Sequence, residues 1–139
     1  VSGAPTDIKE TLTIFGEKVG IAFQLADDVI DIASESHQSG KTPGTDLREG
    51  VPTLVTLNVM KSTRSQDRDL IKLLKAPIKD EKVVAQVLTT LRGHSALDES
   101  RSQLQGIARD ARAALGPLPV NDVTGALFSL CDAIVDRSA

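Results

Sequence analysis

The sequence has no tryptophan, no tyrosine and a single cysteine, and each scarcity argues against a kind of binding surface or cross-link. With only three phenylalanines as aromatic residues, the chain is poorly supplied with surfaces on which nucleic-acid bases stack. Its net charge of -3 likewise gives no basis for a non-specific nucleic-acid interface. One cysteine cannot form an internal disulfide, which favours a reducing compartment, and we therefore predict a cytoplasmic protein. Because Cys131 lies in an apolar stretch, we expect it to be a buried, small hydrophobic residue.

The sequence also lacks any long apolar run, since no segment reaches the ~18 consecutive apolar residues of a membrane span. The first residues, 1–5, contain no initiator Met, no basic region and no apolar signal core, so we expect a portion of a longer chain. The hydrophobic fraction of 40% suffices for one modest core. We therefore predict a single helical domain over residues 1–139.

Apolar periodicity predicts helices throughout, and no segment has the alternation of a strand. Residues 6–33 form one long predicted helix, whose apolar positions recur at steps of three and four. These positions are Ile8, Leu12, Phe15, Val19, Ala22, Ala26 and Ile30. Further helices are predicted over 54–60, 67–75, 80–92, 95–115 and 121–135, and a polar loop over 34–49. His37 and His94 are expected to be exposed. The predicted fold class is all-α, a bundle of about five or six helices.

An Asp-Asp-x-x-Asp cluster lies inside the apolar long helix, at Asp27, Asp28 and Asp31. Carboxylates in an apolar helix are costly to bury unless a cation neutralises them, although a solvated acidic face is the alternative. Gly16 and Gly20 share this face, where they leave room either for tight helix packing or for a ligand.

A carboxylate pair at positions i and i+4 can hold a divalent ion from one side, and Asp27 and Asp31 have this spacing. Mg²⁺ typically takes one or two carboxylates, several waters and substrate phosphate oxygens. Asp28 could orient water or add an outer contact. Lys41 follows about ten residues later and can offer a point charge to a diphosphate beside the metal. The Gly40-Lys41-Thr42 triplet is not a P-loop, because it lacks the upstream glycine and the preceding strand.

These residues closely resemble those of the trans-polyprenyl diphosphate synthases. The resemblance covers the run from Phe23 to Asp31, then Gly40-Lys41, the run from Gly44 to Gly50, and Thr53-Leu54. The aspartates resemble the second aspartate-rich motif of that family. The resemblance implies the C-terminal half of the isoprenoid synthase fold. It also implies a Mg²⁺-dependent prenyltransferase that condenses an allylic diphosphate with isopentenyl diphosphate, head to tail, as a homodimer.

The resemblance also implies a role for each site residue. Asp27 and Asp31 would bind Mg²⁺ with support from Asp28, and Lys41 would contact the allylic diphosphate. Gln24 and Phe23 would line the site near the reacting carbon, and Asp46 would act in an outer shell that orders the loop.

The sequence departs from the family pattern in several places. The first aspartate-rich motif, the basic residues for isopentenyl diphosphate and the Lys-Thr pair of the family are absent. Val51 stands where many members carry lysine, and Val55 where many carry proline. Arg48 lies close enough in sequence to compensate for that lysine. Because the 139-residue chain would supply only one wall of the active-site cavity, we predict that it has no meaningful turnover by itself.

Other functions are compatible with the same residues. Some relatives of the family are non-catalytic subunits of heteromeric synthases, although those often lose the aspartates that this chain keeps. Terpene cyclases also use aspartate-rich metal sites, but the Gly-Lys loop and the Gly-Thr-Asp-Leu-Arg-Glu-Gly run favour a synthase. A plain helical interaction module with solvated aspartates is a further alternative.

Overall fold

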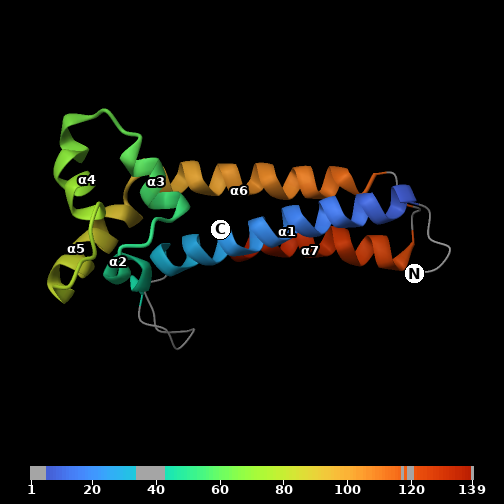
Figure 1. The fold of residues 1–139 in the computed structure, drawn as a ribbon, viewed down its shortest axis with the longest axis horizontal. Helices are drawn as coiled ribbons and strands as arrows, with labels where there is room; N and C mark the ends of the chain where they lie inside the picture. Colours follow the sequence, from blue (N-terminus) through green and yellow to red (C-terminus); the bar gives the residue numbers. More distant parts are fainter. Residues whose placement is uncertain (1–5, 34–42, 117, 119–120, 139) are drawn as a thin grey trace. The chain divides into compact units, whose positions relative to one another are not determined.

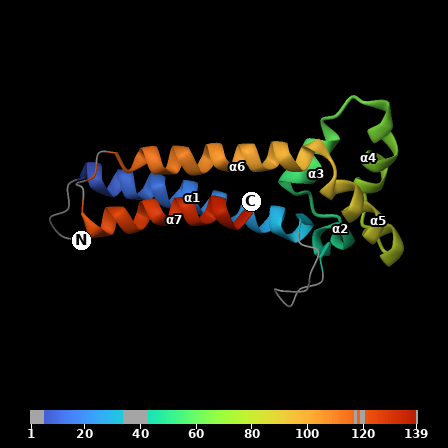
Figure 2. The ribbon, with the colours of Figure 1, turned by 180° about the vertical axis from the view of Figure 1, so that it is seen from behind.

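The computed structural model describes residues 6–33, 43–116, 118 and 121–138, and the regular secondary structure in this part of the chain is helical (Figures 1 and 2). The α-helices are α1 (Thr6–Ala33), α2 (Thr45–Glu49), α3 (Leu54–Met60), α4 (Arg68–Leu74), α5 (Glu81–Arg92), α6 (Ser95–Ala114) and α7 (Asp122–Ser138). A 3₁₀ turn, η1 (Ser65–Asp67), precedes α4. No strand occurs in the described ranges, so the predicted all-α class is confirmed.

Local sequence signals set several helix ends. The side chain and backbone of Thr53 exchange hydrogen bonds with those of Thr56, a capping box that starts α3. Asp80 accepts a hydrogen bond from the Lys82 N–H at the start of α5, and Asn121 accepts one from the Thr124 N–H before α7. The long helix predicted over 6–33 and the helix predicted over 54–60 are confirmed.

The described residues contain seven α-helices, one more than the upper end of the five or six expected. Helix α2 lies within the segment predicted as a polar loop, and residues 34–42 of that segment lie outside the described residues. Five residues are too few to show a helical period, and a helix so short is not stable by itself. It forms because Leu47 is buried in the core at 5% exposure, with glycines in the left-handed conformation at both ends, Gly44 and Gly50.

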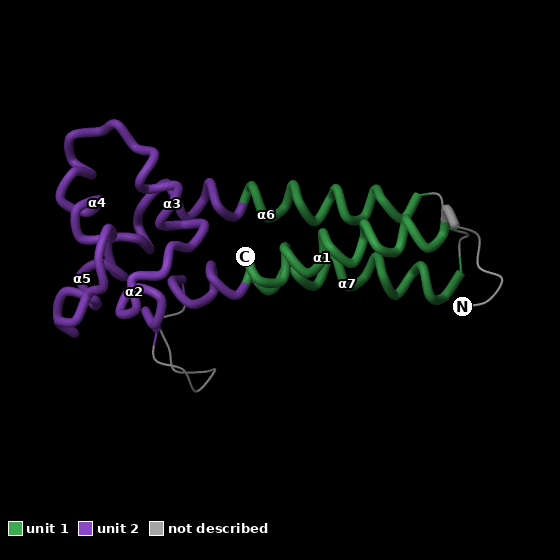
Figure 3. Tube along the Cα trace, in the orientation of Figure 1, with its two compact units in different colours: residues 1–26, 102–139 green, residues 27–101 purple. Residues whose placement is uncertain are grey.

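The chain divides into two compact units, residues 1–26 with 102–139 and residues 27–101 (Figure 3). Helices α1 and α6 each contribute residues to both. The assignment of residues 1–139 to a single domain stays a prediction. The site residues with carboxylates all belong to the unit formed by residues 27–101.

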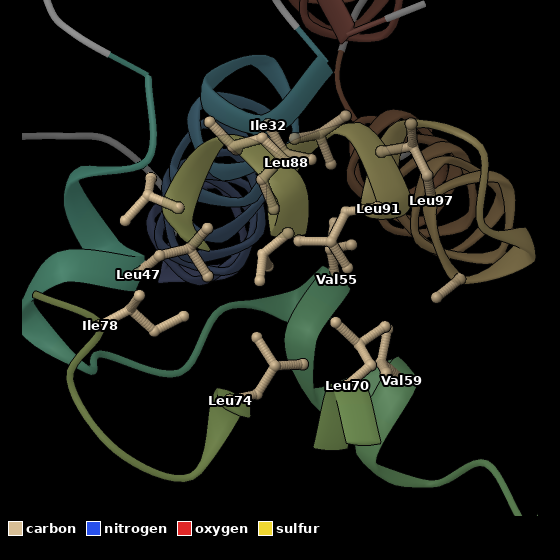
Figure 4. Packing of buried hydrophobic residues seen from close by; sticks show 14 residues of the cluster. Ile32, Leu47, Val55, Val59, Leu70, Leu74, Ile78, Leu88, Leu91 and Leu97 are labelled. Carbon is tan, nitrogen blue, oxygen red and sulfur yellow. The ribbon is translucent and has the colours of Figure 1, made fainter. Parts of the chain in front are cut away.

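The unit of residues 27–101 has a continuous apolar core (Figure 4). Val29 and Ile32 from the last turns of α1 are fully or almost fully buried in it. Its other members include Leu47, Val55, Val59, Leu70, Leu74, Ile78, Leu88, Leu91 and Leu97. The end of α1, which carries the aspartates, is therefore fixed by packing against α2, α3 and α5.

In the unit of residues 1–26 and 102–139, the first part of α1 packs against α6 and α7. Alanines at 22, 26, 108 and 111 are buried at these contacts, and small side chains let helix axes approach closely. Cys131 is 2% exposed, and burial raises the pKa of its thiol, so its predicted role as a buried hydrophobic residue is confirmed.

The glycines of α1 do not serve close packing within the described chain. Gly16 and Gly20 are exposed, and a Cβ added at either would meet no described atom within 4 Å. Of the helices in the described residues, none combines the length and the apolar character needed to cross a membrane.

The expectation that His94 is exposed is wrong. Its side chain is 9% exposed, and its Nε2 lies 2.9 Å from Asp67 Oδ1. Its Nδ1 accepts the N–H of Ala96, which caps the start of α6. Asp67 also accepts hydrogen bonds from the Ser62 hydroxyl and the Arg64 Nε. The cluster forms because residues distant in sequence satisfy one another's hydrogen-bonding groups. The sequence around His94 alone gives no sign of these partners.

Candidate functional site

The last two turns of α1 carry the three aspartates predicted to bind metal. Asp27 is exposed, whereas Asp28 and Asp31 are partly buried. On one helix, the four-residue spacing brings Asp27 and Asp31 onto the same face. Gln24, one turn before Asp28, is exposed.

Phe23 lies half-exposed, at 46%, on the same helix. The guanidinium of Arg137 in α7 lies over its ring, 5.1 Å from the ring centroid. This geometry is favourable for a cation–π interaction. The ring therefore already presents one face to a positive charge.

A tight turn at residues 43–44 brings a backbone N–H donor to Asp31. Gly44 has a φ of 92°, and its N–H donates to Asp31 Oδ2 at 3.2 Å. A Cβ at Gly44 would lie 2.9 Å from Val84 Cγ1 and 3.2 Å from Leu88 Cδ1 on α5. Glycine is therefore needed here both for its conformation and for the close approach to α5.

Helix α2 follows this turn and adds a fourth carboxylate, Asp46. The pKa of Asp28 is raised to about 6, first by burial and then by the negative charges of Asp46, Asp27 and Asp31. Three neighbouring carboxylates, from the end of α1 and the start of α2, thus act on Asp28. Repulsion of this kind favours either proton uptake or a bound cation.

The donor set fits a divalent cation that is shared with a ligand. Within the described ranges, no three acidic, histidine or cysteine side chains converge tightly enough to hold a metal by themselves. Mg²⁺ usually takes only one or two carboxylates, together with water and phosphate oxygens. Asp27 and Asp31 could therefore provide the protein ligands, with Asp28 beside them. Lys41, the predicted diphosphate contact, lies outside the described residues.

Arg48, expected to compensate for the missing lysine, contacts Glu81 and Pro43 in this structure. Its guanidinium donates from Nε and Nη2 to the two carboxylate oxygens of Glu81, each at 2.8 Å. Its Nη1 donates to the carbonyl oxygen of Pro43 at 2.9 Å. Val51 is half-exposed at 47%, whereas Val55 is completely buried in the core. The valine at position 55 is thus explained by packing, and the compensation by Arg48 stays a prediction.

Two features of the site were not predicted from the sequence. One is Glu81, which meets Arg48 from 33 residues away. The other is the Gly44 N–H, since backbone donors leave no signature in side-chain patterns. Only the presence of a glycine at position 44 could have indicated a tight turn at this point of the chain.

Fold and site together define an all-helical protein with a carboxylate cluster where its longest helix ends. A model of the polyprenyl synthetase family matches residues 1–91, and the chain belongs to this family.

Similar proteins extend the match over nearly the whole chain. A nonaprenyl diphosphate synthase of Mycobacterium tuberculosis is 44% identical over 138 residues, which are 98% of this chain and 41% of the relative. The heptaprenyl diphosphate synthase component 2 of Geobacillus stearothermophilus is 31% identical over 132 residues, 93% of this chain and 39% of the relative.

The fold is shared with a geranylgeranyl pyrophosphate synthase from Corynebacterium glutamicum, crystallised with calcium and isoprenyl diphosphate. That protein is 35% identical, with a TM-score of 0.89 over 99% of this chain and 42% of its own. The chain therefore spans about two fifths of the length of these relatives.

Proposed function

We propose that this chain forms the wall of a polyprenyl diphosphate synthase that carries the second aspartate-rich motif. The whole enzyme would condense an allylic diphosphate with isopentenyl diphosphate, head to tail. The supporting observation is the cluster of Asp27, Asp28, Asp31 and Asp46, in which burial and then the negative charges of the other three carboxylates raise the pKa of Asp28 to about 6. A cation shared with a diphosphate would relieve this repulsion.

In this proposal each residue has one task. Asp27 and Asp31 hold Mg²⁺, and Asp28 supports them. Bound Mg²⁺ would supply Lewis-acid neutralisation of the leaving diphosphate. Lys41 contacts that diphosphate, and Asp46 acts in an outer shell that orders the loop.

Gln24 and Phe23 line the site near the reacting carbon. Phe23 suits this place because a ring beside an electron-poor carbon has to attract positive charge to its face. The Phe23 ring already does so, since the Arg137 guanidinium lies over it. The relative crystallised with calcium and isoprenyl diphosphate supports the pairing of a divalent cation with a diphosphate.

The chain alone is proposed to have no meaningful turnover, because it contains one Asp-Asp-x-x-Asp run where the family uses two. The complete enzyme is proposed to be a cytoplasmic homodimer. A second candidate, a subunit of a heteromeric synthase, is favoured by the similarity to a protein named as component 2. Recovery of a distinct catalytic prenyltransferase in a pull-down would support that candidate.

Binding is tested by calorimetry with Mg²⁺ and inorganic pyrophosphate. We expect the wild-type chain to bind pyrophosphate only when Mg²⁺ is present, and the D27N/D31N variant to lose that binding. D98N is the matched control, because the Asp98 side chain is 85% exposed on another helix. Equal binding by wild type and D27N/D31N would refute the metal assignment.

Turnover is tested by isopentenyl incorporation, measured on the native gene product and on this chain. Turnover by the native product, with none by the 139-residue chain, is the expected result. Incorporation by the pure 139-residue chain would refute its proposed inactivity.

A further inference from the structure

The peptide group between Pro43 and Gly44 is bound at both of its ends. Its carbonyl oxygen, on Pro43, accepts a hydrogen bond from Arg48 Nη1 at 2.9 Å. Its N–H, on Gly44, donates to Asp31 Oδ2 at 3.2 Å. A guanidinium and a carboxylate thus hold opposite sides of one peptide plane.

Arg48 is itself held in place by α5. Glu81 accepts two hydrogen bonds from its guanidinium, each 2.8 Å long, in the two-pronged geometry that orients an arginine most strongly. The Arg48 backbone carbonyl also accepts a hydrogen bond from Lys79 Nζ at 3.3 Å. The sequence of contacts runs from Glu81 through Arg48 and the peptide group to Asp31.

The charges along this sequence of contacts alternate favourably. A positive guanidinium at the carbonyl oxygen draws electron density away from the peptide nitrogen. The N–H becomes a better donor to the carboxylate at the other end, as in other hydrogen-bond chains. Arg48 and Asp31 also attract each other directly, since the negative charge of Asp31 is among the causes that raise the pKa of Arg48. The hydrogen bonds at the two ends of the Pro43–Gly44 peptide group add a second, directional path from Arg48 to one oxygen of Asp31.

We propose that Arg48 and Glu81 are positioning residues for Asp31, acting through the Pro43–Gly44 peptide group to fix one oxygen of its carboxylate. This rests on the proposed function, in which Asp31 binds Mg²⁺. With one oxygen fixed by the Gly44 N–H, the orientation of the carboxylate is set before the cation arrives. Preorganisation of this kind lowers the cost of binding.

A simple tether between α2 and α5 is the competing explanation for the Arg48–Glu81 pair. The charge-swapped variant R48E/E81R separates the two. It restores an ion pair between the helices, but position 48 then has no donor for the Pro43 carbonyl. A tether predicts rescue by the swap, whereas the positioning role predicts none.

The first measurement is amide hydrogen exchange at Gly44 by NMR on the full 139-residue chain. We expect exchange at least about tenfold faster in R48K and in R48E/E81R, the scale set by a hydrogen bond to a charged group. R112K is the matched control, because Arg112 makes an exposed ion pair with Asp132 at 2.7 Å. Unchanged exchange in R48K, or rescue by the swap, would overturn the proposal.

The second measurement is calorimetry with Mg²⁺ and inorganic pyrophosphate on the same variants. If wild type binds, we expect R48K and E81Q to bind about tenfold more weakly, with far-UV circular dichroism spectra and thermal midpoints like those of R112K. Wild-type affinity in R48K would overturn the positioning role. If wild type itself does not bind, the metal assignment fails, and Gly44 exchange alone decides whether Arg48 acts on the peptide group.

Discussion

Replacement of Gly44 by alanine tests how the turn beside the aspartates is built. At a φ of 92°, alanine takes up a left-handed conformation that costs about 1–2 kcal/mol. Its Cβ would also come within 2.9 Å of Val84 Cγ1. Val84 is 1% exposed and β-branched, so it has little room to move, and overpacking of this kind costs about 1–3 kcal/mol. The two effects together predict that G44A lowers the free energy of unfolding by about 2–5 kcal/mol.

The assay is urea unfolding followed by far-UV circular dichroism, since the chain has neither Trp nor Tyr for fluorescence. Gly16 provides a matched control, because it lies mid-helix where an added Cβ meets no described atom within 4 Å. We expect G16A to stabilise the chain by about 0.5–1 kcal/mol through reduced freedom of the unfolded state. A G44A variant within about 0.5 kcal/mol of wild type, or one more stable than G16A, would refute the reasoning.

Three further predictions concern titratable groups. The pKa of Asp67 is lowered to about 2, first by the Ser62 hydroxyl, so its folded value lies below the ordinary 3.8. The stabilisation from ionised Asp67 is therefore complete above pH 3.8 and lost as the pH falls toward 2. In acid unfolding followed by circular dichroism, D67N should therefore show a weaker loss of stability between pH 3.8 and pH 2 than wild type. The pKa of Asp28 is raised to about 6, so its ionised form destabilises the fold above pH 6 and this cost fades as the pH falls toward 3.8. D28N should therefore raise the thermal midpoint at pH 7.5 and leave it nearly unchanged at pH 4, whereas a uniform effect would contradict the assignment. The Cys131 thiol, buried and with a raised pKa, should react with a disulfide reagent many times more slowly in the native chain than in urea, and equal rates would show that it is accessible.

Much of the fold follows from short-range patterns. The bounds of α1 and α3 match those predicted, because apolar periodicity and a capping box act within a few residues of each helix. Helix α2 was missed since its formation depends on burying Leu47 in a core assembled from distant segments. His94 was misplaced for the same reason, because its partner Asp67 lies 27 residues away.

The candidate site divides in the same way. Asp27, Asp28 and Asp31 could be found from spacing alone, because one helix fixes their relative positions. The contribution of Asp46 to the electrostatics at Asp28, and the contact between the Gly44 N–H and Asp31, required the turn between α1 and α2 to be placed. No local pattern links Arg48 to Glu81, so the pair could not be predicted from the sequence. It depends on the packing of α2 against α5.

The sequence by itself determined the all-helical class, the long helix and the acidic motif on it, because each depends on interactions within a few turns. The tertiary structure alone decided which groups surround that motif: a glycine N–H, a fourth carboxylate, and an arginine already engaged by Glu81. These contacts arise where separate segments bury apolar side chains against one another, and burial of that kind is a property of the whole packed unit.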